Sequence, residues 1–245
     1  MSRARIVAVK KQILIFRHFP TEGPGYFARF LDHQGLAHRT IKVDEGEPVP
    51  ESIADIPALV FMGGPMSVND PLPWIPQVLR LIRAAVAADV PVLGHCLGGQ
   101  LLSKALGGHV RQNRAKEFGW LPVSTVDSPE TENWLTGLPP RFEVFHWHGE
   151  TFSIPPGASH ILRSRYCRNQ AFVIGKSLGL QCHIEMTPAL VRAWARAGAG
   201  EIARALPGAG VQRPAQMLIG LPQRVARLNR IADVLYTRWL QGLRR

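Results

Sequence analysis

The sequence of 245 residues has few charged residues and no long apolar run. Charged residues make up 19% of it and it contains six Trp and ten Phe, which excludes the charge-rich, aromatic-poor class of disordered proteins. No apolar run reaches the ~18 residues that cross a bilayer, and residues 1–12 lead into a strand-like run without a small-residue cleavage site. Since 46% of the residues are hydrophobic, we expect one folded domain over residues 1–245, located in the cytoplasm and not in a membrane.

Cysteine is scarce as well. Cys96, Cys167 and Cys182 are the three in the sequence, and no two of them form a C-x-x-C pair. An odd, widely spaced set suits neither a disulfide framework nor a structural zinc site, so at least one thiol is available for chemistry. The sequence also lacks a Walker-type phosphate loop and a G-x-G-x-x-G after a strand. We therefore expect no cofactor and no nucleotide site in this chain.

Basic residues outnumber acidic ones, 29 to 18, which gives a formal net charge of +11. Such a balance raises the question of a nucleic acid or another acidic partner. The charges are spread along the chain, however. The densest helical group, with three-residue spacing, is Arg224, Arg227 and Arg230, and this spacing is more typical of a solvated helix face than of a phosphate-binding stripe. Nucleic acid is therefore not expected as a partner.

The first half of the sequence alternates strand-like and helix-like segments. Apolar runs that end at polar or glycine-rich loops predict strands over residues 13–18, 40–43, 58–64 and 91–95. Helical spacing and glycine stops predict helices over residues 24–35, 74–88 and 96–108. Alternation of this kind favours an α/β fold with an open, mostly parallel sheet and helices on both faces.

The second half changes to β-rich stretches and then to helices. Residues 119–126, 142–154 and 171–185 predict strands that extend the sheet with antiparallel additions. Residues 188–206 and 222–243 predict two helices, so a helical C-terminal extension is expected over about 188–245. No internal repeat and no boundary between domains is evident.

Residues 92–100, VLGHCLGGQ, have the form of a strand, a nucleophile between small residues, and a helix. This is the pattern of a nucleophile elbow with cysteine in place of serine. The sharp turn crowds the backbone of the nucleophile, which explains glycine at positions 94 and 98. Cys96 would lie at the N-terminus of the helix, where backbone amides favour the thiolate. Most isolated cysteines are small buried hydrophobes, but the glycines favour a reactive Cys96.

A thiolate nucleophile needs a base, and residues 181–185, QCHIE, supply a candidate pair. The segment looks like a strand, on which residues two apart share a face. His183 and Glu185 would then point one way, and Cys182 and Ile184 the other. Glu185 could orient the His183 imidazole and stabilise its charged form, which completes a nucleophile, base and orienter set.

With these residues in view, the sequence resembles the class I (triad) glutamine amidotransferases over most of residues 13–187. GHCLGGQ is similar to the family's G-x-C-x-G-x-Q signature, MGGP (62–65) to its oxyanion loop, HWHGE (146–150) to its S-H-G segment, and QCHIE to its Q-F-H-P-E motif. The run MGGPMSVND is especially similar to stand-alone proteins that resemble the amidotransferase part of GMP synthase. The resemblance implies a flavodoxin-like architecture.

The resemblance also implies roles for single residues. Cys96, His183 and Glu185 would be the catalytic triad, and the N–H groups of Gly64 and Leu97 would bind the oxyanion. Gln100 and the His148-Gly149 region would hold the glutamine.

Three positions depart from the family pattern. Cys182 replaces an aromatic residue, Ile184 replaces proline, and Trp147 stands where the substrate-side motif often has serine. The first two would point away from the triad. Trp147 could reshape the pocket that recognises glutamine or a larger γ-glutamyl group.

A metal site is the alternative for the histidines, since His146 and His148 would share a strand face and His183 and Glu185 could complete the ligand set. Dispersed His and carboxylate residues produce such sets by chance, and the elbow would remain unexplained. We therefore expect no metal.

The resemblance predicts hydrolysis of the glutamine side-chain amide through a γ-glutamyl thioester on Cys96. About sixty residues follow Glu185, too few for an ATP-dependent synthetase domain, so the ammonia would go to a separate acceptor enzyme on another chain. Two alternatives remain open. The same triad could belong to a γ-glutamyl peptidase, or the chain could be a non-catalytic binding module with this fold.

Overall fold

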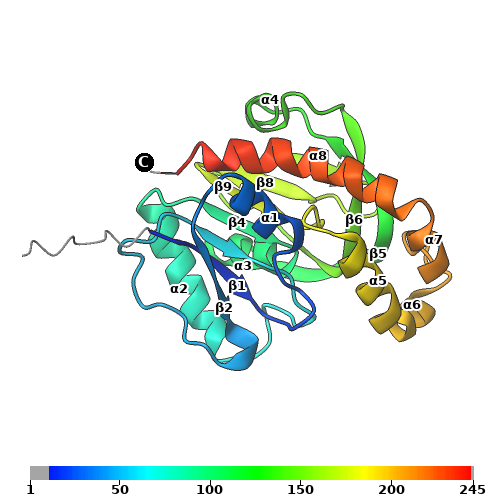
Figure 1. Ribbon diagram of the computed structural model, residues 1–245, viewed down its shortest axis with the longest axis horizontal. Coiled ribbons are helices and arrows are strands. Elements are labelled where there is room, and N and C mark those ends of the chain that lie inside the picture. Colours follow the sequence, from blue (N-terminus) through cyan, green and yellow to red (C-terminus); the bar gives the residue numbers. More distant parts are fainter. Residues whose placement is uncertain (1–10, 244–245) are drawn as a thin grey trace, which may run out of the picture.

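The computed structural model describes residues 11–243, and over this range it contains a nine-stranded sheet with helices on both faces (Figure 1). The expected α/β class is confirmed. The strands are β1 (Ile13–Arg17), β2 (His38–Lys42), β3 (Leu59–Phe61), β4 (Val92–His95), β5 (Val110–Thr125), β6 (Arg141–Phe152), β7 (Ser159–Ser164), β8 (Ala171–Ile174) and β9 (Ser177–Leu180).

The helices are α1 (Gly25–His33), α2 (Trp74–Ala87), α3 (Leu97–Ala105), α4 (Pro129–Leu135), α5 (Pro188–Ala197), α6 (Ala199–Ala205), α7 (Pro214–Leu218) and α8 (Leu221–Leu240), with a short 3-10 turn at Val43–Glu45. Within the described residues, no helix is both long and apolar enough to cross a membrane.

The sheet is mixed. Its strands lie in the order β2-β1-β3-β4-β9-β8-β7-β5-β6. The first five of these, from β2 to β9, pair in parallel. From β9 onward the neighbours pair antiparallel, which is the extension that the second half of the sequence predicts. The carboxyl ends of the parallel strands therefore meet along one edge of the sheet.

The parallel strands are apolar on both faces because helices cover both. Along β1, Ile13 and Ile15 lie in one core cluster with α1, α5 and α8, whereas Phe16 lies in the other with α2 and α3. All three residues of β3, Leu59–Phe61, are buried. Burial on both faces explains why these strands read as continuous apolar runs rather than as alternating patterns.

The C-terminal region contains the helices α5 to α8, with more breaks than the sequence predicts. The helix expected over residues 188–206 is two helices, α5 and α6, which meet at Gly198. A Cβ at Gly198 would lie 2.1 Å from the ring of Trp147, so the break leaves room for that indole. The short elements α4, α7 and β7 were not predicted. Long α8 buries the expected apolar positions along one stripe.

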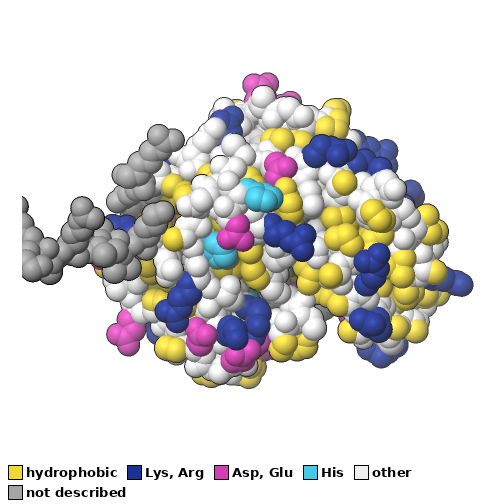
Figure 2. Space-filling view, in the orientation of Figure 1, with side chains coloured by type: hydrophobic (Ala, Val, Ile, Leu, Met, Phe, Trp, Pro, Cys, Tyr) yellow, Lys and Arg dark blue, Asp and Glu magenta, His cyan; other side chains and the backbone are white. Residues whose placement is uncertain are grey.

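The three arginines of α8 differ in their surroundings. Arg224 lies 3.7 Å from Glu143 and 5.8 Å from the centre of the Trp120 ring, while Arg227 and Arg230 are exposed. Figure 2 shows Lys and Arg side chains over the C-terminal helices, interrupted by hydrophobic and uncharged groups. No continuous basic stripe is visible on this face.

The contact of α3 with β3 predicts a large cost for any side chain at Gly98. A Cβ there would lie 2.0 Å from the carbonyl oxygen of Phe61. Gly98→Ala should lower the free energy of unfolding by about 1–3 kcal/mol in urea denaturation. Gly200→Ala, on the exposed face of α6, is the matched control and should raise it by about 0.5–1 kcal/mol. Equal stabilities for Gly98→Ala and the unchanged protein would contradict this packing.

Candidate active site

Cys96 forms the turn between β4 and α3. Its backbone angles are φ 50° and ψ −105°, in a region that residues with a side chain rarely occupy. The N–H of Cys96 donates to the carbonyl oxygen of Leu180 (2.8 Å), and its own carbonyl accepts from the N–H of Gln100 (3.0 Å). These bonds fix the strained turn between the sheet and the helix, as a nucleophile elbow requires.

Glycines surround this turn for the steric reason that the sequence suggested. A Cβ at Gly94 would lie 2.3 Å from the carbonyl oxygen of Gly98. Gly99, which was not singled out from the sequence, approaches β9 equally closely, since a Cβ there would lie 2.3 Å from the carbonyl oxygen of Leu180. The backbones of β4, α3 and β9 therefore pack in direct contact around Cys96.

His183 and Glu185 face each other, although the strand predicted for them does not exist. Strand β9 ends at Leu180, and His183 makes one isolated bridge in which its N–H donates to the Phe145 carbonyl (2.8 Å). The Nδ1 atom of His183 lies 2.6 Å from Oε1 of Glu185. Cys182 and Ile184 point into the apolar core, as predicted. The extended backbone keeps this alternation without the ladder of a sheet.

The charges of this pair support each other. Burial alone would lower the pKa of His183, but the carboxylate of Glu185 and the thiol of Cys96, which forms a hydrogen bond with the ring, raise it well above its usual value. Burial would raise the pKa of Glu185, yet His183 and His95 hold it at about 2. A protonated His183 imidazole beside an ionised Glu185 carboxylate is therefore the favoured charge state of this pair.

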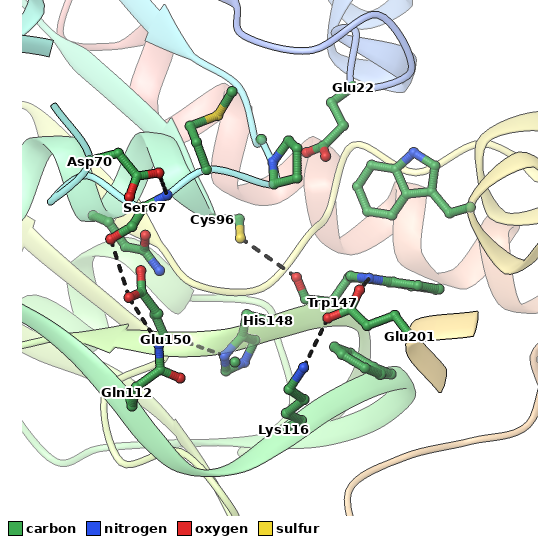
Figure 3. Close-up of a pocket in the computed structure, with 17 residues that line it drawn as sticks. Glu22, Ser67, Asp70, Cys96, Gln112, Lys116, Trp147, His148, Glu150 and Glu201 are labelled. Carbon is green, nitrogen blue, oxygen red and sulfur yellow. Dashed lines mark hydrogen bonds and ion pairs between the residues drawn. The ribbon is translucent and has the colours of Figure 1, made fainter. Parts of the chain in front are cut away.

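The other two cysteines are poor candidates for the nucleophile. Burial raises the pKa of the Cys167 thiol to about 11 and that of the Cys182 thiol further. The Cys96 sulfur lies at a cleft, 3.8 Å from the carbonyl oxygen of Trp147 (Figure 3). The amide of Gln181 donates to this sulfur over 3.6 Å. Gln181 belongs to the QCHIE motif, but its contact with the thiol could not be read from the sequence.

A second layer of buried groups lies behind Glu185. The Nε2 atom of His95 is 3.8 Å from Oε2 of Glu185 and 3.0 Å from the hydroxyl of Tyr236 in α8. Burial lowers the pKa of His95 to about 4, which makes this ring neutral at pH 7. The N–H of Tyr26 donates to the Glu185 carbonyl (2.7 Å), so α1 and α8 both support this residue.

The cleft in front of Cys96 has a volume of about 420 Å³, within the ~300–1,000 Å³ typical of small-molecule sites. Four of the residues that the resemblance assigned to oxyanion or substrate binding line it: Gly64, Gln100, His148 and Gly149. Leu97 is the first residue of α3, where an N–H has no partner within the helix. Its buried side chain does not line the cleft.

Two of these residues are also engaged in the fold. The amide of Gln100 donates to the Gln181 side chain over 3.3 Å. The His148 ring faces the Glu150 carbonyl through Nδ1 (3.0 Å) and the Glu117 carboxylate through Nε2 (3.0 Å). His148 therefore offers the cleft its backbone more than its ring nitrogens.

The histidines of β6 do not converge on His183 and Glu185, as the metal alternative required. His146 and His148 share a face of the strand, but they gather around Glu117, and these three are the metal-capable group found among the described residues. Glu117 also accepts from Ser164 (2.7 Å) and Gln170 (2.6 Å). Glu117 was not predicted from the sequence, because it stands in none of the motifs that drew attention there.

Trp147, the departure from the family pattern, turns its indole toward the C-terminal helices. The ring stacks on Phe118 (centroids 5.0 Å apart) and meets Trp194 edge to face (6.1 Å). Its N–H donates to Glu201 of α6 over 3.1 Å. Trp147 thus joins the helical extension to the cleft, and together with Trp194 it forms an aromatic wall.

Comparison with known protein families identifies the family of this chain. A model of the family described as glutamine amidotransferase class-I matches residues 28–192. The chain belongs to this family. The amidotransferase segment thus spans β-strands and helices from α1 to α5, and it includes Cys96, His183 and Glu185.

Individual proteins that are similar to this chain support the same family. A glutamine amidotransferase of Methylobacillus flagellatus has a solved structure that superposes with a TM-score of 0.92, at 44% identity over 97% of both chains. One subunit of the glutamine-hydrolysing GMP synthase of Sulfolobus acidocaldarius is 33% identical over 64% of this chain and 80% of its own length. The glutamine amidotransferase-like protein YfeJ of Salmonella typhimurium is 29% identical over 69% of this chain and 74% of its own.

The charge coupling at this site predicts a shift when the carboxylate is neutralised. In Glu185→Gln the effect of burial on His183 is no longer offset by the carboxylate charge, so the pKa of His183 should fall. Titration of the His183 Cε1–H signal by NMR measures this. Glu143→Gln, in β6, is a control that should leave the signal unchanged. An unshifted pKa in Glu185→Gln would contradict the coupling.

Proposed function

We propose that this class I glutamine amidotransferase hydrolyses the side-chain amide of glutamine and supplies the ammonia to a separate acceptor enzyme. The observation that carries this proposal is the arrangement of Cys96 at a strained turn beside the His183–Glu185 pair, with the sulfur open to the cleft. These side chains would act as the catalytic triad. We also propose that the chain forms one domain, because α8 shares a core cluster with the sheet. Its location in the cytoplasm stays a prediction.

In the first step the Cys96 thiolate would attack the amide carbon of glutamine, and the carbonyl oxygen would take up negative charge. The N–H groups of Gly64 and Leu97 would bind this oxyanion, and donors of this kind typically contribute ~3–4 kcal/mol each. His183 would then give its proton to the departing nitrogen as the carbon–nitrogen bond breaks. Ammonia leaves and a γ-glutamyl thioester remains on Cys96.

In the second step His183, now neutral, would take a proton from a water molecule that attacks the thioester. Glutamate leaves, and Cys96 returns as the thiolate beside the protonated imidazole. Glu185 would hold the ring in place and stabilise its charge in both steps. The glutamyl part would lie against Gln100, Gly149 and the backbone of His148, which line the cleft.

The relatives support a partner on another chain. The matched Sulfolobus protein is named as one subunit of a GMP synthase, so that protein works within a larger enzyme. We propose a comparable synthetase partner for this chain. Of the three arginines considered earlier, Arg227 and Arg230 are exposed and could meet an acidic surface, whereas Arg224 is engaged with Glu143 and Trp120.

A γ-glutamyl peptidase is the second candidate, and one observation favours it. The cleft continues past Cys96 to the wall of Trp147 and Trp194, where a leaving group larger than ammonia could lie. The same triad chemistry applies. A non-catalytic binding module, the third alternative, does not account for the strained cysteine and its charged pair.

Substitution of the triad tests the proposed chemistry. Cys96→Ala should lower the release of glutamate from glutamine at least ~1,000-fold, because no other group can form the thioester. Glu185→Gln should reduce the rate of glutamate release by a factor about 10–100 times smaller than His183→Ala does, since the base survives and only its orientation weakens. A coupled glutamate assay measures the three variants. Cys167→Ala is the control that should keep turnover, and an active Cys96→Ala enzyme would remove the nucleophile assignment.

Dependence on a partner predicts slow turnover by the isolated chain. Proteins captured on the immobilised chain from its native extract should raise kcat for glutamine about 5–150-fold, the range of ordinary coupling between sites. Arg227→Glu together with Arg230→Glu should weaken capture without changing the isolated activity. If no captured protein alters kcat, the separate acceptor is contradicted while the hydrolysis itself is not.

A further inference from the structure

The cleft has two halves, which lie on opposite sides of Cys96 (Figure 3). In one half Ser67, Asp70, Gln112 and Glu150 form a connected polar wall. The other half holds Glu22, Trp147, Glu201 and Lys116. The proposed hydrolysis places the glutamyl part of the substrate against Gln100, His148 and Gly149 and gives no role to Glu22, so the second half needs its own explanation.

Four acidic side chains line the cleft, and three of them have partners. Asp70 accepts from the N–H of Ser67 (2.9 Å), and Glu150 accepts from the Ser67 hydroxyl (3.2 Å). Glu201 accepts from Lys116 (3.0 Å) and from the indole N–H of Trp147 (3.1 Å). Glu22 makes no hydrogen bond or ion pair through its carboxyl group with any other residue in the described range 11–243. It is the acidic group of the cleft that is left for a ligand.

The main chain around Glu22 is nevertheless well anchored. Its N–H donates to the carbonyl oxygen of Phe19 (3.0 Å), and the carbonyl of the preceding Thr21 accepts from the indole N–H of Trp194 (2.9 Å). Trp194 in turn meets the His183 ring edge to face, with centroids 4.8 Å apart. The carboxyl group is therefore presented from a fixed loop, as a binding group should be.

Glu22 lies on the side of Cys96 from which the leaving group departs. A Cβ at Gly63 would be 2.2 Å from Oε2 of Glu22 and 3.1 Å from Cε1 of His183, so the two side chains flank the same glycine. His183 is the group that protonates the departing nitrogen. A carboxylate next to it faces the amine half of the substrate, not the glutamyl half.

The chemistry of this half suits a positive charge. An ammonium group gains from a carboxylate and from nearby aromatic faces such as those of Trp147 and Trp194. A ligand with neither a positive charge nor a hydrogen-bond donor would cover the carboxylate without giving it a partner, which costs free energy. Burial and the charge of Glu185 raise the pKa of Glu22, against the opposing effect of His183, to about 7.

We propose that Glu22 is the specificity-determining residue of a leaving-group subsite, and that the preferred substrates are γ-glutamyl amides whose leaving amine carries a second, positively charged amino group. This inference rests on the proposed function. The thiolate attacks as before, the carbon–nitrogen bond breaks, and His183 protonates the leaving nitrogen. The second ammonium group keeps its proton and its contact with Glu22 throughout.

Two substrates of equal size isolate the charge. γ-Glutamyl 2-aminoethylamide and γ-glutamyl n-propylamide have the same number of non-hydrogen atoms, and only the first carries an ammonium group. At pH 8, where Glu22 is ionised, kcat/KM should favour the aminoethylamide at least ~10-fold, the value of one charge-assisted contact. At pH 6 this ratio should fall, because Glu22 becomes protonated. The common effects of pH on His183 and Glu185, the charged groups that face Glu22, cancel in the ratio.

Variants assign the preference to one side chain. Glu22→Gln should bring the ratio close to one, and Glu22→Asp should keep a preference, which also shows that the loop tolerates substitution. Glu201→Gln is the matched control, because this carboxylate of the same half already has partners, and it should retain the preference. A ratio near one in the unchanged enzyme, or no cleavage of either amide while glutamine is hydrolysed, would overturn the inference. Loss of glutamate release from every substrate would instead contradict the proposed function.

Discussion

Direct contact between backbones around Cys96 is the constraint on which this active site depends. The first turn of α3 lies so close to β3 and β9 that Gly98 and Gly99 have no room for a side chain. The same approach forces Cys96 to a φ of 50°, a conformation that typically costs ~1–3 kcal/mol. The cost is tolerated because β9 binds the N–H of Cys96 and α3 binds its carbonyl oxygen. Position and orientation of the sulfur are thereby fixed before any substrate binds.

The parallel half of the sheet brings the remaining groups to this cysteine. The strands β1, β3, β4 and β9 are neighbours in the sheet, and they are followed by Glu22, Gly64, Cys96 and His183 respectively. Residues that are far apart in sequence thus meet at one carboxyl edge, where open α/β sheets usually bind their ligands. The antiparallel half contributes differently. Through β6 it adds Trp147, whose indole ties the helical extension to the cleft.

Much of this site could be predicted from the sequence because its signals are local. The elbow around Cys96 and the two-residue spacing of His183 and Glu185 each lie within a few residues, and they survive even where the predicted strand does not. Contacts between distant segments could not be foreseen. Glu22 stands in a loop with no motif of its own, and only the fold brings it beside His183. The short elements α4 and β7 were not predicted for a different reason: an element of a few residues shows too little hydrophobic periodicity.

The contact between Tyr236 and His95 has a consequence for the order in which the enzyme matures. Protein synthesis runs from the N-terminus, so Cys96 and both of its partners leave the ribosome well before α8 does. Until α8 docks, the hydroxyl that supports His95 is missing and the inner side of Glu185 is open to water. A nascent chain therefore carries Cys96 for some time without the buried layer behind Glu185. The buried side of Glu185 is therefore completed last, when α8 packs over the sheet.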